Sequence, residues 1–220
     1  MSDGPVAVFL SDVPPEFLGL GVVRRHQKGA YLILEGDRSD HVLVVLEGRV
    51  RVSVASSDGR DHLVTIRGPG DLLGEFAALE RDQPRSASAF AVEPVVVQVV
   101  SAEEFEAFLE RSPRAAVVLL RTLTRRLRDA SRTQMEFGSY DTVARVARRL
   151  DELMAEHGEV TADGVRIDLP LTQEELAGWV GASRESVARA LRALRDRGVI
   201  STSRRTVVVH DHAALVRYIG

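Results

Sequence analysis

An uninterrupted stretch from Ser112 to Phe137 (SPRAAVVLLRTLTRRLRDASRTQMEF) constrains the fold of this chain more than any other segment. Ser112 followed by Pro113 is a helix start signal, because the hydroxyl can accept from free backbone amides and proline suits the first turn. No helix breaker occurs before Gly138. The sequence therefore predicts one long helix, with strand-like periodicity before it and helical periodicity after it.

Seven positions of this helix recur at alternating spacings of four and three residues, which keeps one stripe facing a partner helix. They are Ala116, Leu120, Leu123, Leu127, Ala130, Gln134 and Phe137. We interpret the segment as a dimerisation helix. The alternative is a helix packed on its own domain, and Val117, Val118 and Leu119 broaden the apolar surface enough to serve both roles.

From Arg24 to Val100, apolar residues come in short runs separated by glycine turns, which is typical of antiparallel strands in a barrel or sandwich. The strand at 49–54 is expected to turn its valines to one face and its polar residues to the other. Ser56 to Gly59 is expected to form its hairpin turn. Ser101 and Glu104 form a capping box that predicts a helix over 102–111. The predicted strands are 31–34, 42–46, 50–54, 63–66 and 95–100.

Composition excludes several classes of protein. The 220 residues contain no cysteine, which removes disulfides, thiolate metal sites and iron–sulfur clusters. The six histidines are scattered, so we expect no metal. A net charge of −3 gives no global sign of nucleic acid. Without a long apolar run, a signal peptide or a catalytic constellation, we expect a cytoplasmic protein that is neither membrane-bound nor an enzyme.

A glycine-framed loop, predicted over 70–79, is followed by Arg85 and Ser86. A glycine lets the backbone approach a ligand, the carboxylate of Glu75 can accept from a sugar hydroxyl, and an arginine beside a serine can bind a phosphate. These are the parts of a nucleotide pocket. The alternative is an ordinary turn with a surface charge.

The string GDLLGEFAALERDQPRSASAFA resembles the phosphate-binding cassette of the cyclic-nucleotide-binding domain in bacterial cyclic AMP receptor proteins. The resemblance implies that Gly74 and Glu75 lie at the ribose, with Glu75 accepting from the 2′-hydroxyl. It also implies that Arg85 and Ser86 hold the cyclic phosphate. In that family two adjacent hydroxyl residues of the dimer helix contact the adenine. Here Ser131 supplies one hydroxyl and Ala130 lacks the other. The resemblance implies cyclic AMP (cAMP) as the effector, and the missing hydroxyl leaves another effector as the alternative.

The segment after the long helix has helical periodicity over 140–157 and a turn between short strands at 160 and 165–169. Thr172 and Glu175 then form a second capping box, and Ser183 caps a further helix beyond the turn at Gly181. Two short helices joined at a glycine are typical of a helix-turn-helix. Strands over 200–209 are expected to form a wing, followed by a short closing helix.

The second of these helices should bury one face and present arginines on the other. Its segment ASRESVARAL resembles the recognition helix of the cyclic AMP receptor family. That resemblance implies that Arg184, Glu185 and Arg189 read bases in a TGTGA-like half-site. Contacts to the DNA backbone are assigned to Ser183, Arg192 and Arg195 of the helix and to Arg204 and Arg205 of the wing.

The resemblance covers nearly the whole chain and implies an α+β architecture. It places a β-roll sensor at 1–111, a dimerisation helix and hinge at 112–138, and a winged helix-turn-helix at 139–220. We expect a homodimer that binds double-stranded DNA and RNA polymerase, with effector contact at Ser131 transmitted through Gly138. The alternatives are the same DNA-binding regulator with another effector or none, and a protein-interaction dimer without an operator.

Overall fold

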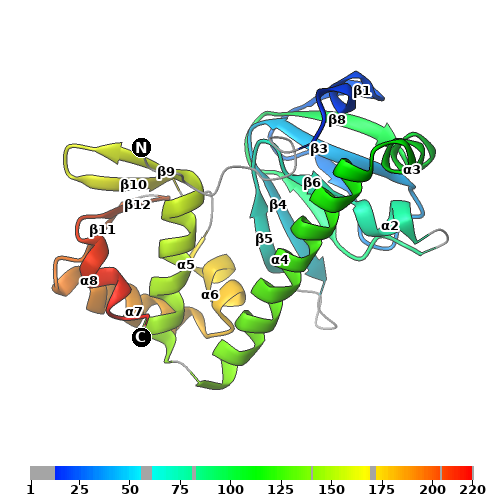
Figure 1. Cartoon of the computed structure of the whole chain (residues 1–220). Coiled ribbons are helices and arrows are strands. Elements are labelled where there is room, and N and C mark those ends of the chain that lie inside the picture. The colour runs from blue at the N-terminus through cyan, green and yellow to red at the C-terminus, as the bar shows by residue number, and fades with distance from the viewer. Residues whose placement is uncertain are drawn as a thin grey trace. The chain divides into compact units, whose positions relative to one another are not determined.

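The protein consists of two compact units joined by one long helix. The computed structural model describes residues 13–55, 61–80, 83–139, 141–168, 172–203 and 205–219, with the backbone alone for 132–139. Among the described residues, those up to Arg128 belong to one unit and those from Asp129 belong to the other, so the division falls within the long helix α4 (Pro113–Ser139) (Figure 1). Each unit mixes helices with antiparallel sheet, as the sequence predicts.

The N-terminal unit is a β-roll of two four-stranded sheets. The first has the order β1-β8-β3-β6, and the second has the order β2-β7-β4-β5. Every described pairing in both sheets is antiparallel, which confirms the predicted architecture. The strands are β1 (Val22–His26), β2 (Tyr31–Ile33), β3 (His41–Glu47), β4 (Val50–Ala55), β5 (Asp61–Arg67), β6 (Leu72–Leu73), β7 (Ser88–Ala91) and β8 (Val95–Ser101).

Five of these strands match the predicted runs, and one prediction about their faces is wrong. Alternation along β4 fails because the β4–β5 register shifts between Val52 and Ser53, as at a β-bulge. Ser53 is buried at 2% exposure while Val54 is only half-buried, so the valines do not share one buried face. The sequence analysis also missed β1, β6 and β7. The predicted turn at 56–59 lies outside the described residues.

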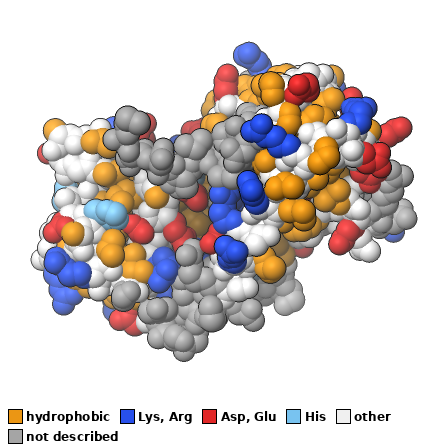
Figure 2. All heavy atoms as spheres, in the orientation of Figure 1, with side chains coloured by type: hydrophobic (Ala, Val, Ile, Leu, Met, Phe, Trp, Pro, Cys, Tyr) orange, Lys and Arg blue, Asp and Glu red, His pale blue; other side chains and the backbone are white. Residues whose placement is uncertain are grey.

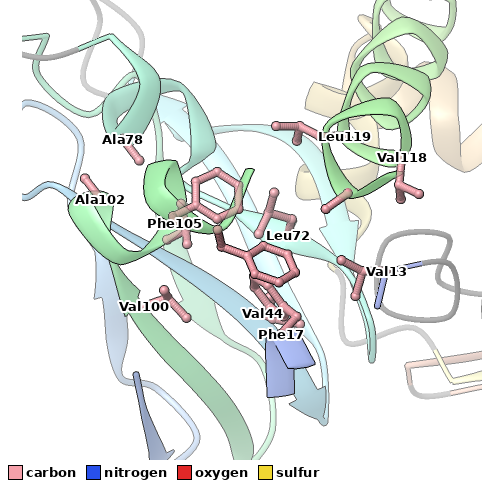
Figure 3. Packing of buried hydrophobic residues seen from close by; sticks show 13 residues of the cluster. Val13, Phe17, Val44, Leu72, Ala78, Val100, Ala102, Phe105, Val118 and Leu119 are labelled. Carbon is pink, nitrogen blue, oxygen red and sulfur yellow. The ribbon is translucent and has the colours of Figure 1, made fainter. Parts of the chain in front are cut away.

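The helices of this unit pack on one side of the roll around phenylalanine rings (Figure 3). Phe17, from the 3₁₀ helix η1 (Pro15–Gly19), meets Phe105 edge to face at 6.3 Å between ring centroids. Phe105 lies on α3 (Ala102–Arg111), whose Ser101–Glu104 capping box is present as predicted. Val118 and Leu119 of α4 complete this cluster, so one face of the long helix serves the core of its own unit.

Helix α4 follows the predicted course but is longer. It continues through Gly138 to Ser139, so the helix does not stop at the glycine. The hinge role of Gly138 stays a prediction. Among the described seam positions, Leu120 and Leu127 are 63% and 68% exposed, while Leu123 is partly buried against the phenylalanine cluster.

The C-terminal unit combines four helices with a four-stranded antiparallel sheet of order β11-β12-β10-β9. Asp141 caps α5, which therefore begins at Thr142, two residues later than predicted. The predicted wing is half of the larger sheet, because β12 pairs with β10 as well as β11. The elements are α5 (Thr142–His157), β9 (Gly158–Thr161), β10 (Gly164–Asp168), α6 (Gln173–Val180), α7 (Arg184–Asp196), β11 (Ile200–Ser203), β12 (Thr206–Val209) and α8 (His212–Val216).

The core of this unit lies between α5, α6 and α7. Trp179 of α6 is 8% exposed, and the Arg149 guanidinium of α5 lies 5.2 Å from the centre of its ring. The tryptophan is therefore packed rather than free to stack on a base. Within the described part of the chain, no helix has the length and hydrophobicity needed to span a bilayer.

Candidate functional site: a buried arginine and an arginine-bearing helix

The segment after β5 is not the loop that the sequence predicted. It contains β6 and the short helix α2 (Glu75–Leu79), which begins at Gly74 in the left-handed conformation, φ +78°. A five-residue helix has too little periodicity to be recognised in sequence, and its N-cap is a glycine without a capping side chain. The consequence is that Glu75 occupies the first turn of a helix.

Arg85 is buried beneath this helix, with only 3% of its surface exposed. Its Nη1 donates to the Gly74 carbonyl at 2.9 Å, and its Nη2 donates to the His41 carbonyl at 2.5 Å. Its Nε donates to the Ser39 hydroxyl at 2.8 Å. The arginine is therefore held from three sides by neutral oxygen atoms.

Gly74 is required where Arg85 packs. A Cβ built on Gly74 would collide with Arg85 Nη1 and approach the His41 carbonyl oxygen to 3.1 Å. The positive φ at Gly74 disfavours any side chain as well. Glycine at this position thus allows the guanidinium to lie directly against the backbone of α2.

Glu75 forms an ion pair that the sequence analysis missed. Its Oε1 accepts from Arg126 Nη1 of α4 at 2.6 Å, and Arg126 Nη2 donates to the Leu72 carbonyl at 2.7 Å. Only 3% of the Glu75 side chain is exposed, against 17% for Arg126. Because 51 residues separate the partners, no local pattern could have paired them. The ion pair ties the start of α2 to the long helix.

The electrostatics around Arg85 favour an anion. Burial lowers the pKa of the Arg85 guanidinium, and Asp40, Glu75 and Asp37 partly offset that effect from a distance. No carboxylate oxygen of a described residue lies in ion-pair contact with Arg85. Burial and the Arg85 charge also lower the pKa of His41. A buried cation without a contacting counter-charge is stabilised by an anionic ligand.

Two other residues predicted for this site, Ser86 and Ser131, are exposed. Ser86 is exposed although it follows the buried Arg85. Ser131 and Ala130 are exposed on α4, beyond Arg128, in the other compact unit. The N-terminal unit thus brings together Gly74, Glu75 and Arg85. The contributions of Ser86 and Ser131 to a ligand site remain predictions.

Helices α6 and α7 have the expected helix-turn-helix form. The capping box of Thr172 and Glu175 opens α6, and Gly181 ends it in the left-handed conformation, φ 60°. Ser183 caps α7 by accepting from the Ser186 amide at 3.1 Å. The predicted caps and the glycine turn are therefore confirmed.

Helix α7 has a buried face and an exposed charged face. Val187, Ala190, Leu191 and Leu194 are buried, as predicted. The exposed face carries Arg184, Glu185, Arg189 and Arg192. Within the part of the chain that the structure describes, the Arg189 guanidinium bonds only the Ser186 hydroxyl, at 2.8 Å. This face offers guanidinium groups and a carboxylate to an external partner.

The other residues assigned to DNA contact differ in their availability. The Ser183 hydroxyl is used as the helix cap and also bonds the Ser186 hydroxyl. Arg195 is half-buried and donates to Thr202 of β11 at 2.9 Å, so it links α7 to the wing. Arg205 is exposed at the wing tip with φ 61°. Arg204 lies outside the described residues. Among the described residues, no group of histidine, aspartate and glutamate side chains is arranged to hold a metal.

Comparisons with known proteins cover both units. Residues 23–112 match the cyclic nucleotide-binding domain, and residues 144–218 match the Crp-like helix-turn-helix domain. The chain is 32% identical over 190 residues to the CRP-like cAMP-activated global transcriptional regulator of Mycobacterium tuberculosis, covering 86% of this chain and 84% of that protein.

Solved structures show the same fold. FixK2 from Bradyrhizobium japonicum has a TM-score of 0.78 at 23% identity, covering 91% of this chain and 98% of that one. The c-di-GMP responsive global regulator CLP from Xanthomonas campestris has a TM-score of 0.76 at 24% identity, covering 89% and 96%. The chain therefore belongs to the cyclic AMP receptor protein family of bacterial transcription regulators, with a cyclic nucleotide-binding domain followed by a Crp-like helix-turn-helix domain.

Proposed function

We propose that this protein is a homodimeric transcription regulator in which a cyclic nucleotide, cAMP in the first place, controls binding to a near-palindromic TGTGA-like operator. The single observation that carries the proposal is the buried Arg85, which is held by neutral acceptors and has no contacting carboxylate among the described residues, in a domain joined to an arginine-bearing helix-turn-helix. The buried arginine is suited to an anionic effector, and the arginine-bearing helix is suited to DNA.

The charge in the pocket supports an effector with one negative group. Arg126 is neutralised by Glu75, so Arg85 provides the positive charge for a ligand. A cyclic nucleotide carries one phosphodiester charge, which matches one arginine. The cAMP-activated relative supports the same ligand. Ser86 is proposed to join Arg85 at the phosphate, while Gly74 and Glu75 are proposed to lie at the ribose and Ser131 at the adenine.

The residue beside Ser131 supports a second candidate effector. Ala130 replaces a hydroxyl residue in the pair expected to contact the adenine. Losing one hydrogen bond weakens binding by about 0.5–1.5 kcal/mol, or up to roughly tenfold. The relative from Xanthomonas campestris responds to c-di-GMP, a larger ligand with two phosphates. The alternative is therefore the same DNA-binding regulator with another effector or none.

Dimerisation is proposed through α4. Hydrophobic side chains gather over its N-terminal half and basic side chains border them (Figure 2). Val117, Leu120 and Leu127 are 44%, 63% and 68% exposed, although α4 buries another face in its own unit. Large exposed leucines at heptad spacing are stabilised by a second copy of the same helix.

In the DNA complex, Arg184, Glu185 and Arg189 of α7 are proposed to read bases. Ser183, Arg192 and the wing arginines 204 and 205 are proposed to meet phosphates. Two copies of α7 would contact half-sites about 10 bp apart. RNA polymerase is the proposed protein partner, by analogy with the family.

Two experiments test the parts separately. Calorimetry with cAMP on wild type and Arg85→Ala tests the effector, and binding that is equal in both proteins would remove Arg85 from the site. A gel shift on the TGTGA palindrome against scrambled DNA, at several salt concentrations, tests the operator. We expect a specificity ratio of at least ~10³, and equal affinity for both duplexes would contradict the proposal.

A further inference from the structure

The loop between β2 and β3 is attached to Arg85 by both backbone and side chain. The Arg85 amide donates to the Asp37 carbonyl, and the Gly36 amide donates to the Arg85 carbonyl, each at 2.8 Å. The Ser39 hydroxyl then accepts from Arg85 Nε, also at 2.8 Å. The loop therefore fixes both the backbone position of Arg85 and the position of its guanidinium group.

The Arg85 guanidinium has more N–H groups than the protein acceptors described around it. A guanidinium has five N–H groups in one plane. Ser39, Gly74 and His41 accept three of them, which leaves two without a partner among the described residues. A cyclic phosphate has two oxygen atoms outside its ring, which share one negative charge. Two N–H groups in a fixed plane match two such oxygens.

Of the three acceptors, Ser39 contributes its side chain and the other two contribute backbone carbonyls. The carbonyls bond the two terminal nitrogens, whereas Ser39 bonds Nε, nearer the aliphatic stem. Without the hydrogen bond at Nε, the guanidinium can rotate about its two hydrogen bonds to the Gly74 and His41 carbonyls. The remaining N–H groups then point in a different direction.

We propose that Ser39 is a positioning residue of the effector site, which orients Arg85 so that its two remaining N–H groups meet the two exocyclic oxygens of a cyclic phosphate. This inference rests on the proposed cyclic-nucleotide function. It assigns no ligand contact to Ser39 itself, which acts through Arg85.

The test uses the full-length protein and cAMP together with its two phosphorothioate diastereomers, in each of which sulfur replaces one exocyclic oxygen. An oriented arginine distinguishes the two diastereomers, because only one of them keeps oxygen at the position with the better hydrogen bond. Calorimetry gives the three affinities for wild type, Ser39→Ala and Ser39→Thr. The matched control is Ser88→Ala, because the Ser88 hydroxyl accepts from the Glu35 amide at 3.0 Å and so holds the same loop without touching Arg85.

We expect Ser39→Ala to weaken cAMP binding about tenfold and to bring the affinity ratio of the diastereomers close to one. Threonine keeps the hydroxyl, so Ser39→Thr should restore the wild-type ratio. Ser88→Ala should leave the affinity ratio of the diastereomers unchanged. A general loosening of the domain would also leave this ratio unchanged, because it weakens the binding of all three ligands alike. A wild-type ratio in Ser39→Ala would overturn the positioning role and leave the proposed function intact. Failure of wild type to bind any of the three ligands would overturn the proposed effector and this inference together.

Discussion

The buried ion pair between Glu75 and Arg126 gives the most demanding prediction about the N-terminal unit. Replacing Arg126 with methionine keeps an unbranched apolar stem of similar length. It removes both the ion pair and the hydrogen bond to the Leu72 carbonyl. Removing one partner of a buried ion pair costs about 3–5 kcal/mol, because the other charge is left unpaired. Since 17% of the Arg126 side chain is exposed, we expect the lower end, about 3 kcal/mol.

Urea unfolding followed by far-UV circular dichroism measures this change. With a slope of about 3 kcal/mol per molar urea, the midpoint should fall by about 1 M. Arg125→Met is the matched control, because Arg125 precedes Arg126 on the same helix and is exposed. It should change stability by no more than about 0.5 kcal/mol.

A double-mutant cycle separates the ion pair from other effects. If the charges are coupled, Glu75→Gln combined with Arg126→Met should cost less than the sum of the single substitutions by at least about 1 kcal/mol. A loss for Arg126→Met no larger than that for Arg125→Met would refute the reasoning. Additive losses would show that the two side chains do not interact in solution.

Three further predictions concern the pocket and the DNA-binding helix. Gly74→Ala should destabilise the protein by about 1–2 kcal/mol and weaken cAMP binding, because φ is positive and the new Cβ displaces Arg85; calorimetry and thermal unfolding measure both, and unchanged binding would contradict it. The lowered pKa of His41 means that the unfolded chain takes up its proton more readily, so stability should fall as the pH drops below about 6.5 and the loss should be complete below the folded-state pKa. His41→Gln should flatten that part of the stability–pH profile, and a profile identical to wild type would remove His41 as its source. Arg189→Ala should cost about 1–3 kcal/mol at one guanine and relax discrimination there, whereas a loss equal on all operator variants in gel shifts would demote Arg189 to a phosphate contact.

The helix-turn-helix could be predicted almost residue by residue because its signals are local. Ser183 is the N-cap of α7, and Thr172 and Glu175 form the capping box of α6, all within four residues of the backbone groups that they satisfy. The buried face of α7 followed from helical periodicity for the same reason. Local hydrogen bonding and periodicity are properties that a sequence displays directly.

The arrangement around Arg85 could be predicted only in part because its contacts are distant in sequence. Ser39 is 46 residues from Arg85, and Arg126 is 51 residues from Glu75. No spacing rule connects such positions. Arg126 follows Arg125 on a helix that the sequence assigns to dimerisation. No local pattern therefore indicates that Arg126 pairs with a carboxylate of its own unit. The bulge that buries Ser53 depends on pairing with β5, which β4 alone does not reveal.

Glu75 and Arg85 have contacts within the protein that the family resemblance alone does not give. The resemblance implies ligand contacts for Glu75 and Arg85, and these contacts stay predictions. The structure adds that Arg85 is buried against neutral acceptors and that Glu75 is bound to the long helix. The start of α2 therefore contacts both arginines, Arg85 through the Gly74 carbonyl and Arg126 through the Glu75 carboxylate. Any ligand that shifts α2 must strain or relax the bond to Arg126.

The most direct test of the central claim is a titration of labelled TGTGA palindrome with the full-length protein, with and without saturating cAMP. If the pocket controls DNA binding, cAMP should tighten the wild-type complex at least about tenfold, which corresponds to about 1.4 kcal/mol of coupling. Arg85→Ala should bind the palindrome equally with and without cAMP. Wild-type binding curves that coincide in the presence and absence of cAMP would contradict the account.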